Sequence, residues 1–446
     1  MCDARNPTRA TWARDGSIYV GEHEASVLSR VGENGGPLTP LLTVPGSFVS
    51  YASPDGRVAL IETRTSVAAD FARIELVSLD SLRRDALAVS GYDARIVDGR
   101  YLVFVRAGNL MVAPFDLVQR RVLGEPMLAV PGVATNSMLG GGQFAVSESG
   151  MLVYASGADR AVGKLVVVDA SASVMELPAP ERLYGMLALS GDGTRLAVQV
   201  SDLNDYVWIY DLRRHEGRRL PVDGRATWPV WSPDGEKMAV WLTARRDPGI
   251  YILPALTAGP AERIFDEALP CTWSPDGHWL AFNAGQGRVK QGVVGVGGGR
   301  SVIPLSTGMQ FSFSSDSRHL AYVAEDTGTN EIWVSSLDGS VPPRQVSAGG
   351  GVEPLWVRDQ IFYRNGRRWF AARVTSLDPQ VQWEPPRQVF EADFLDTPGI
   401  SYAVSPDGQR LFVVRSAREP VVSKLAFVQN WFEELKAKVP VSRGGR

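Results

Sequence analysis

A repeated segment of about 42 residues constrains this chain more than any other feature. It carries Trp-Ser-Pro-Asp-Gly at Trp231–Gly235 and again at Trp273–Gly277, and each copy precedes a short apolar and aromatic run. In this pentapeptide Pro presets φ, Asp bonds its own backbone and Gly accepts a positive φ, so the segment predicts a tight turn. A tight turn between two such runs predicts a β-hairpin.

The same pattern recurs along the chain. An Asp, or a Glu in its place, marks a first hairpin turn at intervals of 40 to 50 residues. The marks are Asp15, Asp55, Asp98, Glu148, Asp192, Asp234, Asp276, Asp316, Asp359 and Asp407. A period of about 40–45 residues with four strands is typical of a β-propeller. We therefore predict an all-β fold of about ten four-stranded antiparallel blades, with most of the tryptophans packed between blades.

The number of repeats leaves the ring arrangement open. One ring usually holds roughly four to eight blades, so ten repeats form either one unusually large ring or two smaller rings. We expect propeller repeats over residues 8–429. A possible division lies near residues 133–145, because Gly140–Gly142 fall in the widest interval between marks.

The C-terminal segment departs from the repeat. A helix is expected over residues 430–439, with Asn430 as its N-cap and with Trp431 and Leu435 on one face. Residues 440–446 are expected to be a frayed tail.

Charge and hydropathy exclude several classes of function. The net charge is −3, so the chain has no overall basic excess for binding nucleic acid. No apolar run reaches the ~18 residues of a membrane-spanning helix, and the first residues lack the apolar core of a signal peptide. As written, the chain is expected in the cytoplasm. Cys2 and Cys271 are too few for a disulfide framework or a cysteine-based zinc site.

The repeats resemble the WD40-like (PD40) repeats of the TolB-type propeller. The order of several landmarks also resembles the propeller sensor region that follows the membrane span of some bacterial serine/threonine protein kinases. These landmarks are Pro114–Asp116, Gly124–Pro126, Phe144–Ser147, Gly150–Tyr154, Val168–Asp169 and Asn430–Leu435. The resemblance covers about residues 8–440. It implies a sensor domain associated with a kinase, and an extracytoplasmic location if the chain is a fragment of a membrane kinase.

The sequence itself lacks the motifs of phosphoryl transfer. It has no Gly-rich loop with a following strand lysine, no His-Arg-Asp catalytic loop and no Asp-Phe-Gly. It also lacks the Gly-x-Ser-x-Gly motif of an α/β-hydrolase, and we interpret Ser147–Gly150 as a hairpin turn.

Candidate metal and acid–base residues have simpler structural interpretations. One turn aspartate per blade indicates that each carboxylate serves its own turn rather than a cation. His278 and His319 are expected at equivalent turn exits on the rim, whereas His23 and His215 lie in polar loops. We predict no catalytic, cofactor-binding or metal-binding residue among them.

Two further patterns are also expected to be structural. The run Gly292–Gly299 lacks the Lys-Ser/Thr ending and following helix of a phosphate loop, so we expect a flexible loop between strands. Pairs of arginines are interpreted as solvated loop charges balanced by nearby acids. The pairs begin at Arg83, Arg213, Arg218, Arg245 and Arg367.

We therefore expect a non-catalytic propeller that binds a protein or peptide partner, as a scaffold or sensor domain without a cofactor. The alternative is a propeller enzyme, a lyase or hydrolase, that uses the central pocket. A third possibility is the remnant of a kinase sensor. Polar side chains converging on the central channel would favour the enzyme, and an exposed aromatic patch would favour a protein partner.

Overall fold

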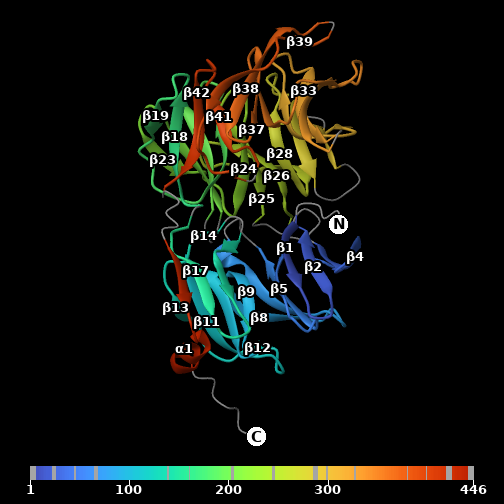
Figure 1. The fold of residues 1–446 in the computed structure, drawn as a ribbon. Helices are drawn as coiled ribbons and strands as arrows, with labels where there is room; N and C mark the ends of the chain where they lie inside the picture. The colour runs from blue at the N-terminus through green and yellow to red at the C-terminus, as the bar shows by residue number, and fades with distance from the viewer. Residues whose placement is uncertain are drawn as a thin grey trace. The chain divides into compact units, whose positions relative to one another are not determined.

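The computed structural model is almost entirely β-structure (Figure 1). It describes residues 7–22, 27–44, 47–64, 69–137, 140–159, 161–201, 205–243, 247–284, 290–297, 300–325, 328–378, 380–397, 399–417 and 424–439. The chain divides into two compact units. The first comprises Met1–Ala161 and Arg418–Arg446, and the second comprises Val162–Ala417. The second unit is thus inserted into the first in sequence.

The second unit consists of six antiparallel sheets. Four of them have four consecutive strands each: β20–β23 (Tyr184–Leu189, Arg195–Val200, Tyr206–Asp211, Glu216–Arg219), β24–β27 (Ala226–Trp231, Lys237–Leu242, Gly249–Pro254, Glu262–Asp266), β28–β31 (Ala268–Trp273, Trp279–Ala284, Gln291–Gly295, Val302–Pro304) and β32–β35 (Met309–Phe313, His319–Glu325, Asn330–Ser336, Arg344–Gln345). The fifth contains β36–β40 (Val352–Val357, Gln360–Asn365, Arg368–Ser376, Gln382–Trp383, Arg387–Glu391).

The sixth sheet joins the two ends of the second unit. Its strands β18 (Gly163–Asp169) and β19 (Val174–Glu176) begin the unit, and β41 (Tyr402–Val404) and β42 (Arg410–Ser416) end it. β18 pairs with β42 along its whole length. An apolar cluster fills each of the six spaces between neighbouring sheets, including the space between the sixth and the first. The second unit is a closed, six-bladed β-propeller.

The first unit contains four sheets of three or more strands. They are β1–β4 (Pro7–Trp12, Ser17–Glu22, Val27–Gly32, Gly35–Thr43), β5–β8 (Ser47–Ala52, Val58–Thr63, Arg73–Ser78, Arg84–Ser90), β9–β13 (Tyr92–Val97, Tyr101–Arg106, Asn109–Asp116, Arg121–Val122, Met127–Val130) and β16-β17-β43 (Phe144–Val146, Leu152–Ala155, Leu425–Val428). A 3₁₀ turn (Ala69–Phe71) and the hairpin β14–β15 (Thr135–Asn136, Gly141–Gly142) complete the unit.

Packing in the first unit differs from that in the second. Apolar clusters join its first sheet to its second, its second to its third, and its third to its fourth. Among the residues that the structure describes, no such cluster joins the fourth sheet to the first. One face of the fourth sheet carries Leu425 and Phe427, which are 62% and 64% exposed. Only the second unit therefore closes by apolar packing within the described residues.

These sheets confirm the predicted all-β propeller fold. Each of the ten turn marks lies in a separate sheet of three or more strands. Of the two arrangements that the sequence left open, the division into two units excludes the single large ring. The boundaries follow Ala161 and Ala417 rather than lying in residues 133–145. Gly140–Gly142 instead lie inside the first unit, where a Cβ on Gly142 would come within 2.7 Å of Val105. The wide interval thus holds an additional packed hairpin, β14–β15.

The C-terminal helix α1 spans Trp431–Lys438 and confirms the helix expected over 430–439. Trp431 and Leu435 are buried on one face, within the cluster between the third and fourth sheets. The Asn430 side chain makes no capping hydrogen bond, because the residue adopts a left-handed conformation. The Trp431 amide donates instead to the Gly150 carbonyl at 2.8 Å. Residues 440–446, the expected frayed tail, lie outside the described residues.

Trp431→Ala should lower the free energy of unfolding of the first unit by about 3–5 kcal/mol, because it leaves a cavity in a packed cluster. Phe427→Ala, at a residue 64% exposed, is the matched control and should cost less than about 1 kcal/mol. Urea unfolding followed by circular dichroism measures both. Equal costs would show that the face of β43 is covered in solution.

Candidate functional site

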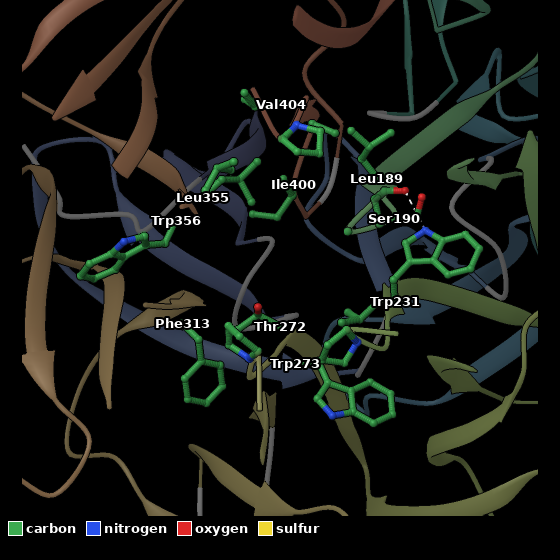
Figure 2. Close-up of a pocket in the computed structure, with 18 of the residues that line it drawn as sticks. Leu189, Ser190, Trp231, Thr272, Trp273, Phe313, Leu355, Trp356, Ile400 and Val404 are labelled. Carbon is green, nitrogen blue, oxygen red and sulfur yellow. Dashed lines mark hydrogen bonds between the residues drawn. The ribbon is translucent and has the colours of Figure 1, made fainter. Parts of the chain in front are cut away.

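The inner strands of all six sheets in the second unit meet around a central cavity of about 530 Å³ (Figure 2). These strands are β20, β24, β28, β32, β36 and β41, and each contacts the next around the ring. The cavity lies where the strands end and the first hairpin turns begin. The repeat places it there, because each blade has its first hairpin turn at the end of its inner strand.

A large apolar residue lies at or next to the end of each inner strand at the cavity, and most of these residues are aromatic. They are Leu189, Trp231, Trp273, Phe313, Trp356 and Val404. The aromatic rings turn away from the hollow, toward the spaces between blades, and all four are at most 8% exposed (Figure 2). Trp231 Nε1 donates to the Ala188 carbonyl of the preceding blade at 3.1 Å. These tryptophans are therefore core residues, as expected, and not an exposed aromatic patch.

The rim of the cavity is formed by the second residue of each hairpin turn. The six equivalent residues are Gly191, Pro233, Pro275, Ser315, Arg358 and Pro406. Five of these side chains are small or cyclic and uncharged. Arg358 is exposed and carries the only charge among the described residues that line the cavity.

The floor of the cavity is a segment that precedes β41. Ile400 lines the cavity and lies near its centre (Figure 2), and its carbonyl accepts a hydrogen bond from the Leu187 amide of β20 at 3.1 Å. Gly399 has φ +89°, and a Cβ there would come within 3.0 Å of the Trp228 ring of β24. Its carbonyl accepts from Gln310 Nε2 of β32 at 3.4 Å. Contacts to three other blades thus hold this segment across the channel and make the cavity a blind funnel.

A buried polar network lies next to the floor. Glu353 is 2% exposed, and its Oε2 accepts hydrogen bonds from the Ser401 amide at 2.8 Å and hydroxyl at 2.7 Å. Tyr402 donates to the Glu353 carbonyl at 2.7 Å, and Gln310 Oε1 accepts from the Glu353 amide at 2.9 Å. Arg364 forms an ion pair with the Glu353 carboxylate. Burial raises the pKa of Glu353, although Arg364 opposes the shift. The network joins β32, β36 and the closing sheet.

Most of the turn aspartates serve their own turns, as expected, but Asp359 pairs with Arg373 Nε at 3.4 Å. Asp234 Oδ1 accepts from the Ser232 hydroxyl at 2.5 Å and from the Glu236 amide at 3.0 Å. The Ser232 oxygen in turn accepts from the Lys237 amide at 2.8 Å. The same arrangement recurs at Asp55, Asp192, Asp276, Asp316 and Asp407. Glu148 differs, because it forms an ion pair with Arg14.

None of the three histidines that the structure describes lines the cavity. His278 and His319 were expected at equivalent turn exits, which is wrong by one residue. His319 donates its amide to the Ser314 hydroxyl at 2.9 Å, as Trp279 does to Ser274, so Trp279 is its equivalent. His319 is therefore buried at the start of β33, whereas His278 is exposed. His215 is exposed in the turn after β22, and His23 lies outside the described residues.

Cysteine and metal chemistry also find no support in the part of the chain that is described. Cys271 lines the cavity, and its Sγ lies 3.0 Å from Asn283 Oδ1. Burial raises the pKa of this thiol to about 12, so it stays protonated at neutral pH. No group of three or more His, Cys, Asp or Glu side chains among the described residues is placed to hold a metal ion. Cys2 lies outside these residues.

Two sequence patterns have structural roles. Gly292–Gly295 lie within strand β30 rather than in the expected loop. Position 292 requires glycine because a Cβ there would come within 2.7 Å of the Ile303 carbonyl. Gly298 and Gly299 lie outside the described residues. Among the arginine pairs, Arg83, Arg84 and Arg367 form ion pairs with nearby acids, and Arg245–Arg246 fall outside the description.

No model of a known protein family matches the chain. Among solved structures, it is similar to the putative TolB from Agrobacterium tumefaciens (16% identity, 58% of this chain and 99% of the other, TM-score 0.47). It is also similar to TolB from Acinetobacter baumannii (14%, 80% and 81%, 0.35) and to the propeller domain of the Trilobed protease from Pyrococcus furiosus (11%, 88% and 97%, 0.34). At these values the likeness adds no argument about a ligand or a reaction. The assignment of the propeller fold rests on the six-sheet ring itself.

No helix among the described residues is long and apolar enough to cross a membrane.

Glu353→Leu should lower the free energy of unfolding of the second unit by about 3–5 kcal/mol, because buried Arg364 then keeps only the exposed Asp396 as a partner. Asp396, the second carboxylate on Arg364, has a side chain 72% exposed, so Asp396→Ala is the control and should cost less than about 1 kcal/mol. Urea unfolding monitored by tryptophan fluorescence measures both. A cost below about 1 kcal/mol for Glu353→Leu would contradict this role.

Acid should weaken the turns. The hydrogen bond from Ser232 holds the pKa of Asp234 below its ordinary value of 3.8. A carboxyl whose pKa is lower in the folded state contributes its stability above the unfolded pKa and loses it as pH falls through the folded pKa. Stability should therefore fall below about pH 4, and the fall should be smaller in Asp234→Ala, which itself costs about 1 kcal/mol at pH 7. Thermal melts from pH 7 to pH 2.5 test this, and an unchanged acid slope in the variant would contradict it.

Proposed function

We propose that the second unit binds a protein or peptide partner by taking an apolar side chain into the blind funnel. The observation that carries this proposal is the cavity of about 530 Å³, walled by the inner strands of all six blades and closed by Ile400. Concave, mainly apolar cavities with few polar groups are typical binding sites. Burying one side chain the size of leucine contributes about 2–3 kcal/mol, so we expect a partner that binds reversibly.

The alternative, a lyase or hydrolase in the same cavity, has less support. Its titratable lining consists of Cys271, Tyr402 and Arg358 within the described residues. Burial raises the pKa of the Cys271 thiol to about 12. It also raises the pKa of Tyr402 well above its ordinary value of 10, and the Tyr402 hydroxyl donates to the Glu353 carbonyl. An acid–base pair tuned near neutral pH is what such an enzyme would require. Association with a kinase, as a sensor domain, stays a prediction from the sequence resemblance.

Panning a random peptide library on the whole chain tests the proposal. Peptides that share an apolar residue should be enriched, and Leu355→Glu, which places a carboxylate on the cavity wall, should weaken their binding at least tenfold. Val302→Glu is the matched control, since Val302 is 36% exposed on the outer strand β31, and should bind as the unaltered chain does.

Isothermal titration of the selected synthetic peptides measures the affinities, and thermal melts confirm that both variants fold. Equal affinity for Leu355→Glu and the unaltered chain would show that the peptides bind elsewhere. An equal loss of peptide affinity in Leu355→Glu and Val302→Glu would also contradict binding in the funnel.

A further inference from the structure

The rim of the funnel is asymmetric in charge. Five of its six equivalent turn positions hold Gly, Pro or Ser, and the fifth blade holds Arg358. In this blade the turn is also shorter, because Val357 pairs directly with Gln360 and leaves only Arg358 and Asp359 between the strands. Among the described residues, the fifth blade thus places a single cation at the mouth of the cavity.

The turn carboxylates near the rim do not neutralise Arg358. Each of the six turn aspartates lies near a basic side chain other than Arg358. These neighbours are Arg195, Lys237, His278, Arg318, Arg373 and Arg410. Asp359, the residue next to Arg358, pairs with Arg373 Nε at 3.4 Å. Among the described residues no ion pair or hydrogen bond engages the Arg358 guanidinium, which therefore stays available as a donor for an anion.

The closed floor limits what can enter. Gly399 and Ile400 are held across the channel by Gln310, Trp228 and Leu187, so they obstruct the passage of an extended chain. A blind funnel admits a side chain or a chain end. A ligand that places an apolar group in the cavity and also pairs with the Arg358 cation carries an anionic group next to its apolar group.

We propose that the funnel recognises the carboxyl-terminal residue of a partner polypeptide, with its apolar side chain above Ile400 and its terminal carboxylate on Arg358. A guanidinium binds a carboxylate through two parallel N–H donors, and such charge-assisted hydrogen bonds are stronger than neutral ones. This inference rests on the proposed function and adds the class of ligand. It also assigns Arg358 as a specificity-determining residue.

Matched peptides test the inference. The probes are acetyl-Gly-Gly-Ala-Leu and acetyl-Gly-Gly-Ala-Phe, each with a free carboxylate and each as the carboxyl-terminal amide. Dissociation constants come from titrations followed by saturation-transfer NMR on the whole chain. We expect the acid to bind about tenfold more tightly than the amide, and this ratio should fall as salt is raised because Arg358 is exposed.

Three variants assign the effect to the rim. Arg358→Gln should reduce the acid-to-amide ratio to about one, because it weakens binding of the acid much more than binding of the amide. Arg358→Lys should retain part of the preference, because the charge stays but the planar fork is lost. Arg387→Gln removes an exposed arginine from strand β40 and should leave the ratio unaltered.

The outcomes separate the two proposals. Equal binding of acid and amide to the unaltered chain, or a preference that survives Arg358→Gln, overturns the role of Arg358 and leaves the apolar funnel standing. Binding of laurate with loss in Arg358→Gln, and without binding of either peptide, identifies a fatty acid instead and overturns the inference. Failure of every probe at millimolar concentration contradicts both the inference and the proposed function.

Discussion

The apolar faces of the blades are the constraint on which the structure depends. A four-stranded sheet of this repeat has two apolar faces and covers neither by itself, so each blade folds only against neighbours. In the second unit six clusters fill six spaces, and the pairing of β18 with β42 closes the ring. In the described part of the first unit three clusters join four sheets, and Leu425 and Phe427 remain exposed on the last one.

Closure of the ring creates the funnel and also blocks it. The inner strand of the closing sheet, β41, begins at Tyr402, and the residues before it must cross from the fifth blade to the inner edge of the sixth. Gly399 and Ile400 make that crossing within the channel, where three other blades bind them. The adjacent Glu353–Arg364 pair fixes the same joint through Ser401 and Tyr402. The floor of the candidate site and the closure of the propeller therefore depend on one set of contacts.

The fold could be predicted from the sequence because its signals are local. A Ser-Pro-Asp-Gly turn stabilises itself through hydrogen bonds within five residues, as Asp234 and Ser232 show. Variants of the same turn mark the other repeats, and each of the ten marks lies in its own sheet. The helix at Trp431 was equally local. Its cap was not, because the bond to Gly150 depends on a residue far away in sequence.

The candidate site could be predicted only in part. Gln310 meets Gly399 across 89 residues, and nothing near Gly399 in the sequence indicates that it crosses a channel. Glu353 and Arg364 look like ordinary strand residues until the bulge in β36 turns Glu353 inward. Arg358 did carry a signal. It occupies the turn position that holds Gly, Pro or Ser in the other five blades, and aligning the turns by position would have singled it out.

The most direct measurement is a crystal structure of the whole chain with a peptide selected by panning. The account predicts that an apolar side chain of the peptide lies within the ring of inner strands and rests on Ile400. A peptide bound to an outer strand of the second unit, or to the exposed face of β43, with ordered water filling the funnel, would contradict it.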